Sequence, residues 1–306
     1  MNFTERLGDR LLSNTRADRV RDVAALTRRS VRSKRGLFRA EGPQNVREAL
    51  RLALSDSPAP GLPGLDAVYV TESELDRHPD IAADLEVVSE RGGVFIRAVT
   101  SEVLAAMTDA VTPQGMLAVC SLPALDLHAA LAPADLACVL VRVQDPGNAG
   151  TVVRAADAAG ARAAVFTSGS VDPFNPKAVR SSAGSLFHVP VVTGADLVDV
   201  AHAAHERGSG ILAADGYANV SVDDLADAAL LRSAGVARSD DAPYDLSRPT
   251  AWLFGNEAQG LTDHEKAHAD LAVAVPLYGA AESLNVGTAA TVCLYSSARV
   301  QRRAHS

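Results

Sequence analysis

The feature that most constrains the fold is a near-continuous apolar run at residues 136–143, which ends in a turn rich in glycine and asparagine at 144–150. A strand with successive apolar residues is typically buried on both faces, as in a parallel sheet covered by helices. A helix to Ala159 and a strand at 163–166 follow. Further strands are predicted at 189–192, 210–214, 251–254 and 271–275, and a last helix at 285–302. This alternation predicts a mostly parallel α/β domain.

The pattern of the chain before this domain predicts a smaller α/β unit. Helices are predicted at 18–26, 44–54 and 101–107, and strands at 37–40, 67–70, 93–96 and 116–120. A stretch containing Pro123 and Pro133 shows few regular signals and separates the two parts. We therefore predict a first domain at 1–122, a linker at 123–135 and a second domain at 136–306.

The composition is that of an ordinary globular protein. Its 306 residues are 47% hydrophobic and 22% charged, which is enough chain for two domains. No apolar run approaches the roughly 20 residues of a membrane helix, and the first residues carry charges where a secretory signal has its apolar core. We expect a cytoplasmic protein. The three cysteines lie among apolar residues, which favours buried free thiols over disulfides or a metal site.

Charge is distributed unevenly along the chain. The net charge is -8, yet residues 1–51 hold 13 basic and 6 acidic side chains, a local net charge of +7. Such a cluster is either a solvated face or a surface that binds phosphates. Its dense part consists of Arg28, Arg29, Arg32, Lys34, Arg35 and Arg39.

Residues 264–268, His-Glu-Lys-Ala-His, match the HExxH pattern of zinc hydrolases. The same stretch can be a capping box, in which Thr262 caps a helix and Glu265 reaches back to the cap. No obvious third metal ligand follows in the next twenty residues. The capping box is the interpretation we favour, and we expect no metal.

Three loops at predicted strand ends are rich in Gly, Asn and Ser: 145–150, 254–261 and 275–286. Each alone could be a tight connection with a helix cap, and neither GxGxxG nor GxxxxGK[ST] occurs, so no dinucleotide or nucleoside triphosphate site is indicated. Together they predict a ligand crevice at the carboxyl edge of the sheet.

These loops resemble the motifs of the SpoU (TrmH-like) family of RNA ribose 2'-O-methyltransferases, in the SPOUT class. Segment 175–184 resembles the family's K-x-x-R-x-S-x-G segment, and residues 28–50 and 111–118 resemble its N-terminal RNA substrate-binding domain. The three motifs are matched by Asn148, Gly150, Arg154, Ala156, Ala158 and Gly160, then by Gly255, Glu257, Gly260 and Leu261, and last by Pro276, Ser283, Leu284, Asn285 and Val286. Gly287 stands where a serine or small residue is more usual.

The resemblance implies a SPOUT-type α/β domain with a trefoil knot, preceded by a ribosomal-protein-like α/β domain. It implies an enzyme that uses S-adenosylmethionine to methylate RNA, more specifically ribosomal RNA, and a homodimer built on the last helix. The basic cluster then becomes an RNA-docking surface. Two alternatives remain open: a knotted RNA-binding protein without catalysis, and a zinc hydrolase.

The resemblance also assigns roles to residues. Gly255, Val275 and Leu284 would contact the cofactor. Arg154 would be the key catalytic residue, and because a guanidinium stays protonated, we expect it to clamp a phosphate or the developing alkoxide and not to act as a base. Asn148 would orient Arg154, Glu257 would pair with or position it, and Ser283 and Asn285 would hold substrate or cofactor.

Overall fold

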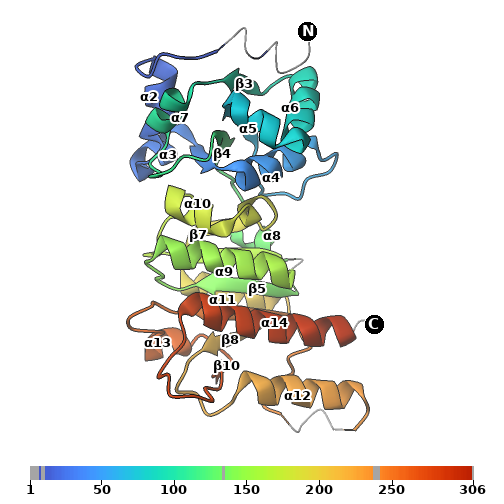
Figure 1. Ribbon diagram of the computed structural model, residues 1–306. Coiled ribbons are helices and arrows are strands. Elements are labelled where there is room, and N and C mark those ends of the chain that lie inside the picture. Colours follow the sequence, from blue (N-terminus) through green and yellow to red (C-terminus); the bar gives the residue numbers. More distant parts are fainter. Residues whose placement is uncertain (1–6, 8–10, 133–134, 237–241, 305–306) are drawn as a thin grey trace. The chain divides into compact units, whose positions relative to one another are not determined.

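The strands form two separate sheets, one in each of two units of the chain (Figure 1). The computed structural model describes residue 7 and residues 11–132, 135–236 and 242–304. One unit consists of the chain up to Pro123 together with Asp172–His188, and the other of Ala124–Val171 and Val189–Ser306.

The sheet of the first unit has four strands in the order β1-β4-β2-β3. Strand β4 runs antiparallel to both of its neighbours, whereas β2 and β3 are parallel. The strands are β1 (Leu37–Glu41), β2 (Leu65–Val70), β3 (Phe95–Ala98) and β4 (Met116–Ser121).

Helices cover this sheet. Helices α2 and α7 bury Val20, Val23, Val103 and Met107 in one cluster with Tyr69 and other sheet residues, and α4 packs against α6 and against β4. Buried apolar residues recur at helical spacing in α4, as the sequence predicts. The helices are α2 (Asp18–Ala25), α3 (Arg29–Arg35), α4 (Pro43–Leu54), α5 (Glu72–Arg77), α6 (Pro79–Arg91) and α7 (Ser101–Met107).

The segment Asp172–His188 differs from the predicted division, which places it in the second domain. It contains helix α10 (Pro176–Ser182) and the short 3-10 helix η1 (Ser185–Phe187), and it groups with the first unit. The physical reason is aromatic packing: Phe174 and Phe187 lie with ring centroids 4.9 and 6.4 Å from that of Phe38 on β1.

The second unit holds a sheet of six strands, all parallel, in the order β10-β8-β9-β5-β6-β7. Strand β5 is fully buried, as its apolar run predicts. The strands are β5 (Leu136–Leu140), β6 (Ala163–Thr167), β7 (Val191–Ala195), β8 (Gly210–Ala214), β9 (Thr250–Phe254) and β10 (Leu271–Val273).

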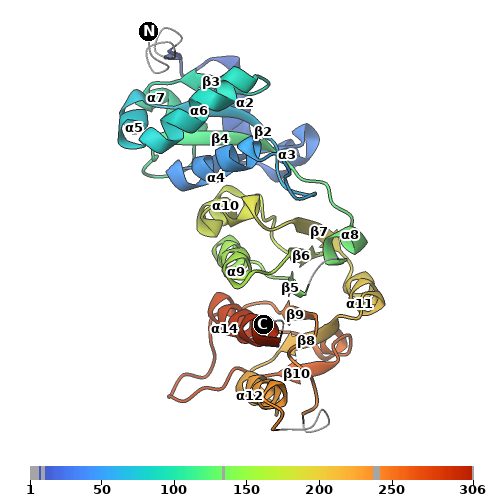
Figure 2. The same ribbon diagram turned by 90° about the vertical axis from the view of Figure 1, so that its right-hand side faces the viewer.

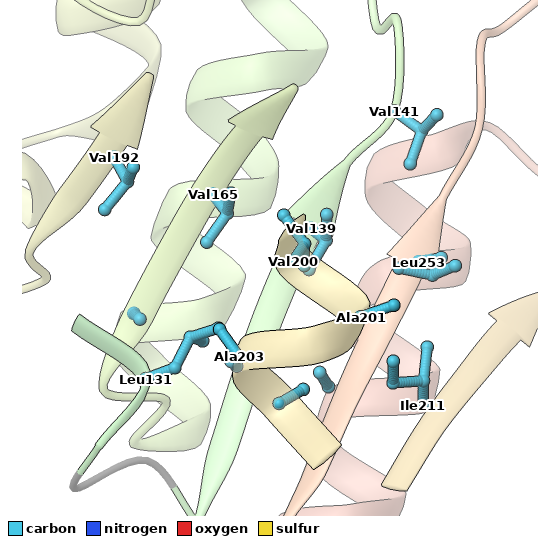
Figure 3. Close-up of a cluster of buried hydrophobic side chains, with 14 of the residues drawn as sticks. Leu131, Val139, Val141, Val165, Val192, Val200, Ala201, Ala203, Ile211 and Leu253 are labelled. Carbon is cyan, nitrogen blue, oxygen red and sulfur yellow. The ribbon is translucent and has the colours of Figure 1, made fainter. Parts of the chain in front are cut away.

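Helices lie on both faces of this sheet (Figure 2). Helices α9, α12 and α14 cover one face, and α8 and α11 cover the other. Under α8 and α11, side chains such as Leu131 and Val200 meet Val139, Val165 and Leu253 of the sheet (Figure 3). The helices are α8 (Leu127–Leu131), α9 (Pro146–Ala159), α11 (Leu197–Glu206), α12 (Val222–Ser233), α13 (Asp263–Lys266) and α14 (Val286–Ala304).

The α/β class with a parallel second sheet is therefore confirmed. Helix α8 lies inside the predicted linker, and α3, α5 and α6 have no counterpart among the predicted helices. Cys120, Cys138 and Cys293 are buried and free, as expected. Across the described chain, no helix has the length and apolar character needed to span a membrane. The trefoil knot stays a prediction.

Candidate active site at the carboxyl edge of the parallel sheet

The three motif loops leave the sheet at its carboxyl edge. Strands β5 and β9 are neighbours whose last residues, Leu140 and Phe254, are partners in register, and the Val141 amide donates to the Phe254 carbonyl at 2.8 Å. The loops after these two strands therefore start side by side. The third loop follows β10 and opens α14. A crevice at the carboxyl ends of parallel strands is the usual position of a ligand in an open α/β sheet.

Helix α9 begins under a side-chain cap. Asp145 is the N-cap residue, and its Oδ1 accepts a hydrogen bond of 2.8 Å from the amide of Asn148. Pro146 occupies the first helical position, where its fixed φ and missing N–H are harmless. Asn148 lies in the first turn of α9, where its side chain can reach the other two loops.

The carboxylate of Glu257 connects the second loop to the first. It accepts hydrogen bonds of 3.1 Å from the amides of Gln144 and Asp145 and one of 3.2 Å from Nδ2 of Asn148. Partial burial works against its charge, but these donors outweigh it and lower the pKa of Glu257. The residue therefore stays ionised and holds the turn before α9 in place.

Asn285 connects the third loop to the first. Its Nδ2 donates to Oδ1 of Asn148 at 2.9 Å, and its own Oδ1 accepts from the amide of Gly287 at 2.8 Å, which caps α14. A continuous chain of hydrogen bonds thus joins Glu257, Asn148 and Asn285. One residue from each motif takes part, and they form what we call the amide relay.

Two glycines allow backbones to approach closely. A Cβ on Gly255 would lie 2.4 Å from the carbonyl carbon of Gly260, so the second loop could not close on itself with any larger residue. A Cβ on Gly287 would lie 2.8 Å from Cγ2 of Thr151 on α9. The departure from the family's usual serine at 287 thus coincides with tight packing of α14 on α9.

Sequence reasoning missed Arg142, which lies at the end of the apolar run. It adopts φ of +54°, a left-handed conformation that is uncommon outside glycine. Its guanidinium donates to Glu265 through Nε at 2.5 Å and Nη2 at 2.9 Å, and its carbonyl accepts from Nδ2 of Asn256 at 3.0 Å. Arg142 thus ties the first loop to the second and to α13. The signal in the sequence is a lone charge inside residues 136–143.

The capping-box prediction for residues 262–265 is confirmed. Thr262 Oγ1 accepts from the Glu265 amide, and the Glu265 carboxylate accepts from the Thr262 amide at 2.7 Å. The rings of His264 and His268 contact each other edge to face, with centroids 5.3 Å apart. In the described part of the chain no group of three His, Cys, Asp or Glu side chains could hold a metal ion. The Glu265 carboxylate accepts hydrogen bonds from Arg142 and Thr262. Glu265 is therefore engaged within the chain and is not positioned to act as the base of a zinc hydrolase.

Comparison with known proteins gives the family. The model of the SpoU rRNA Methylase family matches residues 135–295, and that of the MRM3-like substrate binding domain matches residues 17–118. The 23S rRNA (guanosine(2553)-2'-O)-methyltransferase RlmP of Bacillus subtilis is 33% identical over 93% of this chain and 97% of its own. The chain belongs to the SpoU rRNA methylase family.

Further similarities agree with this assignment to the SpoU family. The 23S rRNA (uridine(2479)-2'-O)-methyltransferase of Streptomyces viridochromogenes is 34% identical over 61% of each chain. Among solved structures, the SpoU methyltransferase AviRb from Streptomyces viridochromogenes, in complex with the cofactor AdoMet, superposes with a TM-score of 0.73. It is 27% identical and covers 94% of this chain and 98% of AviRb.

The remaining motif residues of the SpoU family lie outside the amide relay. Arg154 is exposed on α9 and forms no hydrogen bond or ion pair with any described residue. The expected contact of Glu257 with Arg154 is replaced by its contact with Asn148. Ser283 is exposed, and so is Leu284 with 36% of its surface, whereas Val275 is half-buried.

The loop after β10 suits the cofactor of the SpoU family. Residues 276–284 form no backbone hydrogen bond with the described chain, so their N–H and C=O groups are available to a ligand. Leu277 and Leu284 expose apolar surface beside them. S-adenosylmethionine has an adenine, a ribose and a sulfonium but no phosphate. It can therefore be bound by backbone groups and apolar side chains, and it needs no phosphate-binding lysine.

The basic cluster divides into two classes. Arg32 and Arg39 are 2% and 1% exposed, which removes them from the predicted RNA-facing set. Arg32 donates to the carbonyl of Leu26 and pairs with Asp172 at 2.5 Å, and Arg39 pairs with Asp109 at 2.8 Å. Both hold the first unit together. The four that remain on the surface are Arg28, Arg29, Lys34 and Arg35.

Proposed function

We propose that this protein transfers the methyl group of S-adenosylmethionine to a ribose 2'-hydroxyl of ribosomal RNA. The amide relay carries the proposal, because it brings one residue from each SpoU motif to the carboxyl edge of one sheet. S-adenosylmethionine would supply the methyl group, because its sulfonium leaves as a neutral thioether when the bond from sulfur to the methyl carbon breaks. Gly255, Val275 and Leu284 are the residues we assign to its binding.

Arg154 is the residue we assign to the reacting hydroxyl. A guanidinium stays protonated in proteins, so Arg154 remains a fixed positive charge. Such a charge stabilises a developing alkoxide or holds an adjacent phosphate. Ser283 and Asn285 lie in the third loop, where they would hold substrate or cofactor, while Glu257 and Asn148 position the turn before α9.

We further propose that the protein is a homodimer in which each site draws on two subunits. Asn148 and Arg154 are six residues apart on α9, which is about 9 Å along the helix axis and about two-thirds of a turn around it. The two side chains therefore point in different directions. We therefore assign Arg154, which is exposed and pairs with no described residue, to the site of the partner subunit and not to the one that its own Asn148 helps to build.

The first unit is the part that we assign to RNA docking. Its match to a substrate-binding domain and the surface cations Arg28, Arg29, Lys34 and Arg35 support this assignment. We keep the boundary near residue 123 and add residues 172–188 to this domain. We assign this enzyme to the cytoplasm, as a compartment where the ribosomal RNA that it would modify is present.

The test is to map 2'-O-methylation in ribosomal RNA from cells with and without the gene. We expect one ribose to lose its methyl group in the absence of the gene and to regain it when purified protein and S-adenosylmethionine are added. The Arg154→Ala protein should not restore it. Identical methylation maps, together with RNA binding by the purified protein, would favour the alternative of a knotted RNA-binding protein without catalysis.

A further inference from the structure

The first unit contains a cavity of about 510 Å³ that the methyl transfer does not use. Its wall is formed by the end of β1, the first turn of α4, residues 108–114 and helix α10. Polar residues dominate this wall, and they include Glu41, Gln44, Asn45, Gln114 and Arg180. The volume lies in the range of small-ligand sites.

Asn45 is the first sign that this cavity is built for a ligand. The residue is 4% exposed, and its Nδ2 donates to the carbonyl of Glu41 at 2.8 Å. Its Oδ1 is buried and accepts no hydrogen bond from any described residue. Buried amide oxygens are nearly always satisfied, so this acceptor is open to a donor from outside the chain.

The N-terminus of α4 supplies donors to the same wall. Gly42 is the cap residue, has φ of +90° and offers no side chain to the first turn. The backbone N–H groups of Gln44 and Asn45 have no hydrogen-bond partner in the described chain. A Cβ on Gly42 would meet only the movable side chain of Gln114, so it is the positive φ that favours glycine there.

The charges around the cavity cancel. Arg180 Nη1 lies 3.0 Å from Glu41 Oε2 and 3.0 Å from Asp109 Oδ1. The buried Arg39 pairs with the same two carboxylates. Burial works against the charge of Asp109, but the hydrogen bond from Arg180 and the charge of Arg39 outweigh it and lower the pKa of Asp109. Two cations thus face two anions, and a phosphate would find no net positive charge.

The ligand must therefore be neutral and carry both hydrogen-bond donors and acceptors. A nucleobase meets these requirements, and proteins that read RNA sequence do so on unpaired bases held in such pockets. Val111 at the wall is fully exposed and offers an apolar surface to a base. We propose that this cavity binds one unpaired nucleobase of the RNA, an inference that rests on the proposed RNA methyltransferase function.

The test is to titrate the full chain with adenosine, guanosine, cytidine and uridine separately, using ligand-observed NMR. At least one nucleoside should bind saturably, and inorganic phosphate should not displace it. Asn45→Leu removes the free acceptor at similar volume, and Thr112→Trp fills the cavity from its exposed wall. Each should weaken binding by about tenfold or more, whereas Glu102→Trp, at an exposed position on α7 outside the wall, should not.

Thr112→Trp keeps the test decisive if Asn45→Leu fails to fold. Absence of saturable binding by all four nucleosides, unchanged binding in Thr112→Trp, or displacement by phosphate would overturn the proposal. The Arg154→Ala protein should bind the nucleoside as the wild type does. Absence of methyl transfer by the wild-type protein, with nucleoside binding intact, would count against the proposed function and not against the base pocket.

Discussion

Nδ2 of Asn285 donates to Oδ1 of Asn148 at 2.9 Å, although 137 positions separate the two residues. The same Asn285 caps α14 through its other amide atom. One side chain therefore serves both the amide relay and the stability of the last helix, and a substitution can separate these two roles.

Asn285→Asp should keep the cap and break the relay, because Asp is as good a helix cap as Asn but has no N–H to donate. We expect an unfolding free energy within about 0.5 kcal/mol of the wild type and a fall in kcat of about tenfold or more. Asn285→Ala should also lose the cap, at about 0.5–2 kcal/mol. Thermal unfolding beside a methyl-transfer assay measures both. Wild-type kcat in Asn285→Asp would mean that the relay has no part in catalysis.

The proposed two-subunit site predicts complementation between inactive variants. Arg154→Ala and Glu257→Ala should each abolish transfer, but a mixed dimer contains one site with an intact Arg154 from one subunit and intact loops from the other. We therefore expect activity to return when the two variants are refolded together, and not when either is refolded alone. No recovery in verified mixed dimers would place Arg154 in the site of its own subunit.

Arg154→Ala alone should leave cofactor binding and stability nearly unchanged. Arg154 is exposed and contacts no described residue, and the residues assigned to the cofactor lie in the other two loops. Calorimetric titration should give an affinity for S-adenosylmethionine within a few-fold of the wild type. A large loss of that affinity would contradict the division of roles.

Much of the second unit could be predicted because its signals are local. Strand β5 follows from a run of apolar residues, and α9 from a proline and a glycine that bracket it. Helix α5 escapes prediction because Leu75 is its single buried residue, whereas Ile81, Leu85 and Val88 of α6 recur at helical spacing and made that helix predictable. The transfer of residues 172–188 to the first unit depends on Phe174 and Phe187 meeting Phe38, a contact that no periodicity encodes.

The motif residues of the site could be named from the sequence, but their partners could not. Glu257 pairs with Asn148 and not with Arg154, because the turn before α9 presents two amides and Asn148 together. Arg32 and Arg39 belong to a basic cluster in the sequence, yet both are buried against carboxylates far along the chain. Charge density alone cannot separate a solvated arginine from a buried one.

The surface cations should set the salt dependence of RNA binding. Arg28, Arg29 and Lys34 are exposed, and their side chains have no partner among the described residues. Replacing all three with Ser should flatten the plot of log affinity against log salt, by about 0.7–0.9 in slope for each phosphate that the variant no longer neutralises. Filter binding over a range of salt concentrations measures the slope.

Two controls make this result specific. Replacing the exposed Arg162 and Arg207 of the second unit with Ser should leave the slope unchanged. Arg32→Ser should instead destabilise the protein, because it leaves Asp172 without its partner. An unchanged slope in the triple variant would mean that the cluster is only a solvated face.

The last prediction concerns Glu265, where the structure changes the expected effect of one substitution. From the sequence alone Glu265→Gln should be nearly harmless, because Gln can also complete a capping box. The carboxylate, however, also receives two hydrogen bonds from Arg142, at 2.5 and 2.9 Å. We now expect Glu265→Gln to cost about 1–3 kcal/mol at pH 7, whereas Glu90→Gln, at an exposed position on α6, should cost almost nothing.

The pH dependence identifies the charge as the cause. Hydrogen bonds from Arg142, together with those from Thr262, outweigh partial burial and lower the pKa of Glu265 from its ordinary 4.5 to about 2. The stabilisation should therefore be complete above about pH 5 and disappear as the pH falls toward 2. Urea unfolding of wild type and Glu265→Gln should give a difference that shrinks over this range. A difference in unfolding free energy near zero at pH 7 would show that the ion pair between Arg142 and Glu265 does not stabilise the protein. A difference that stays constant down to pH 2 would show that the charge of the carboxylate does not cause the stabilisation.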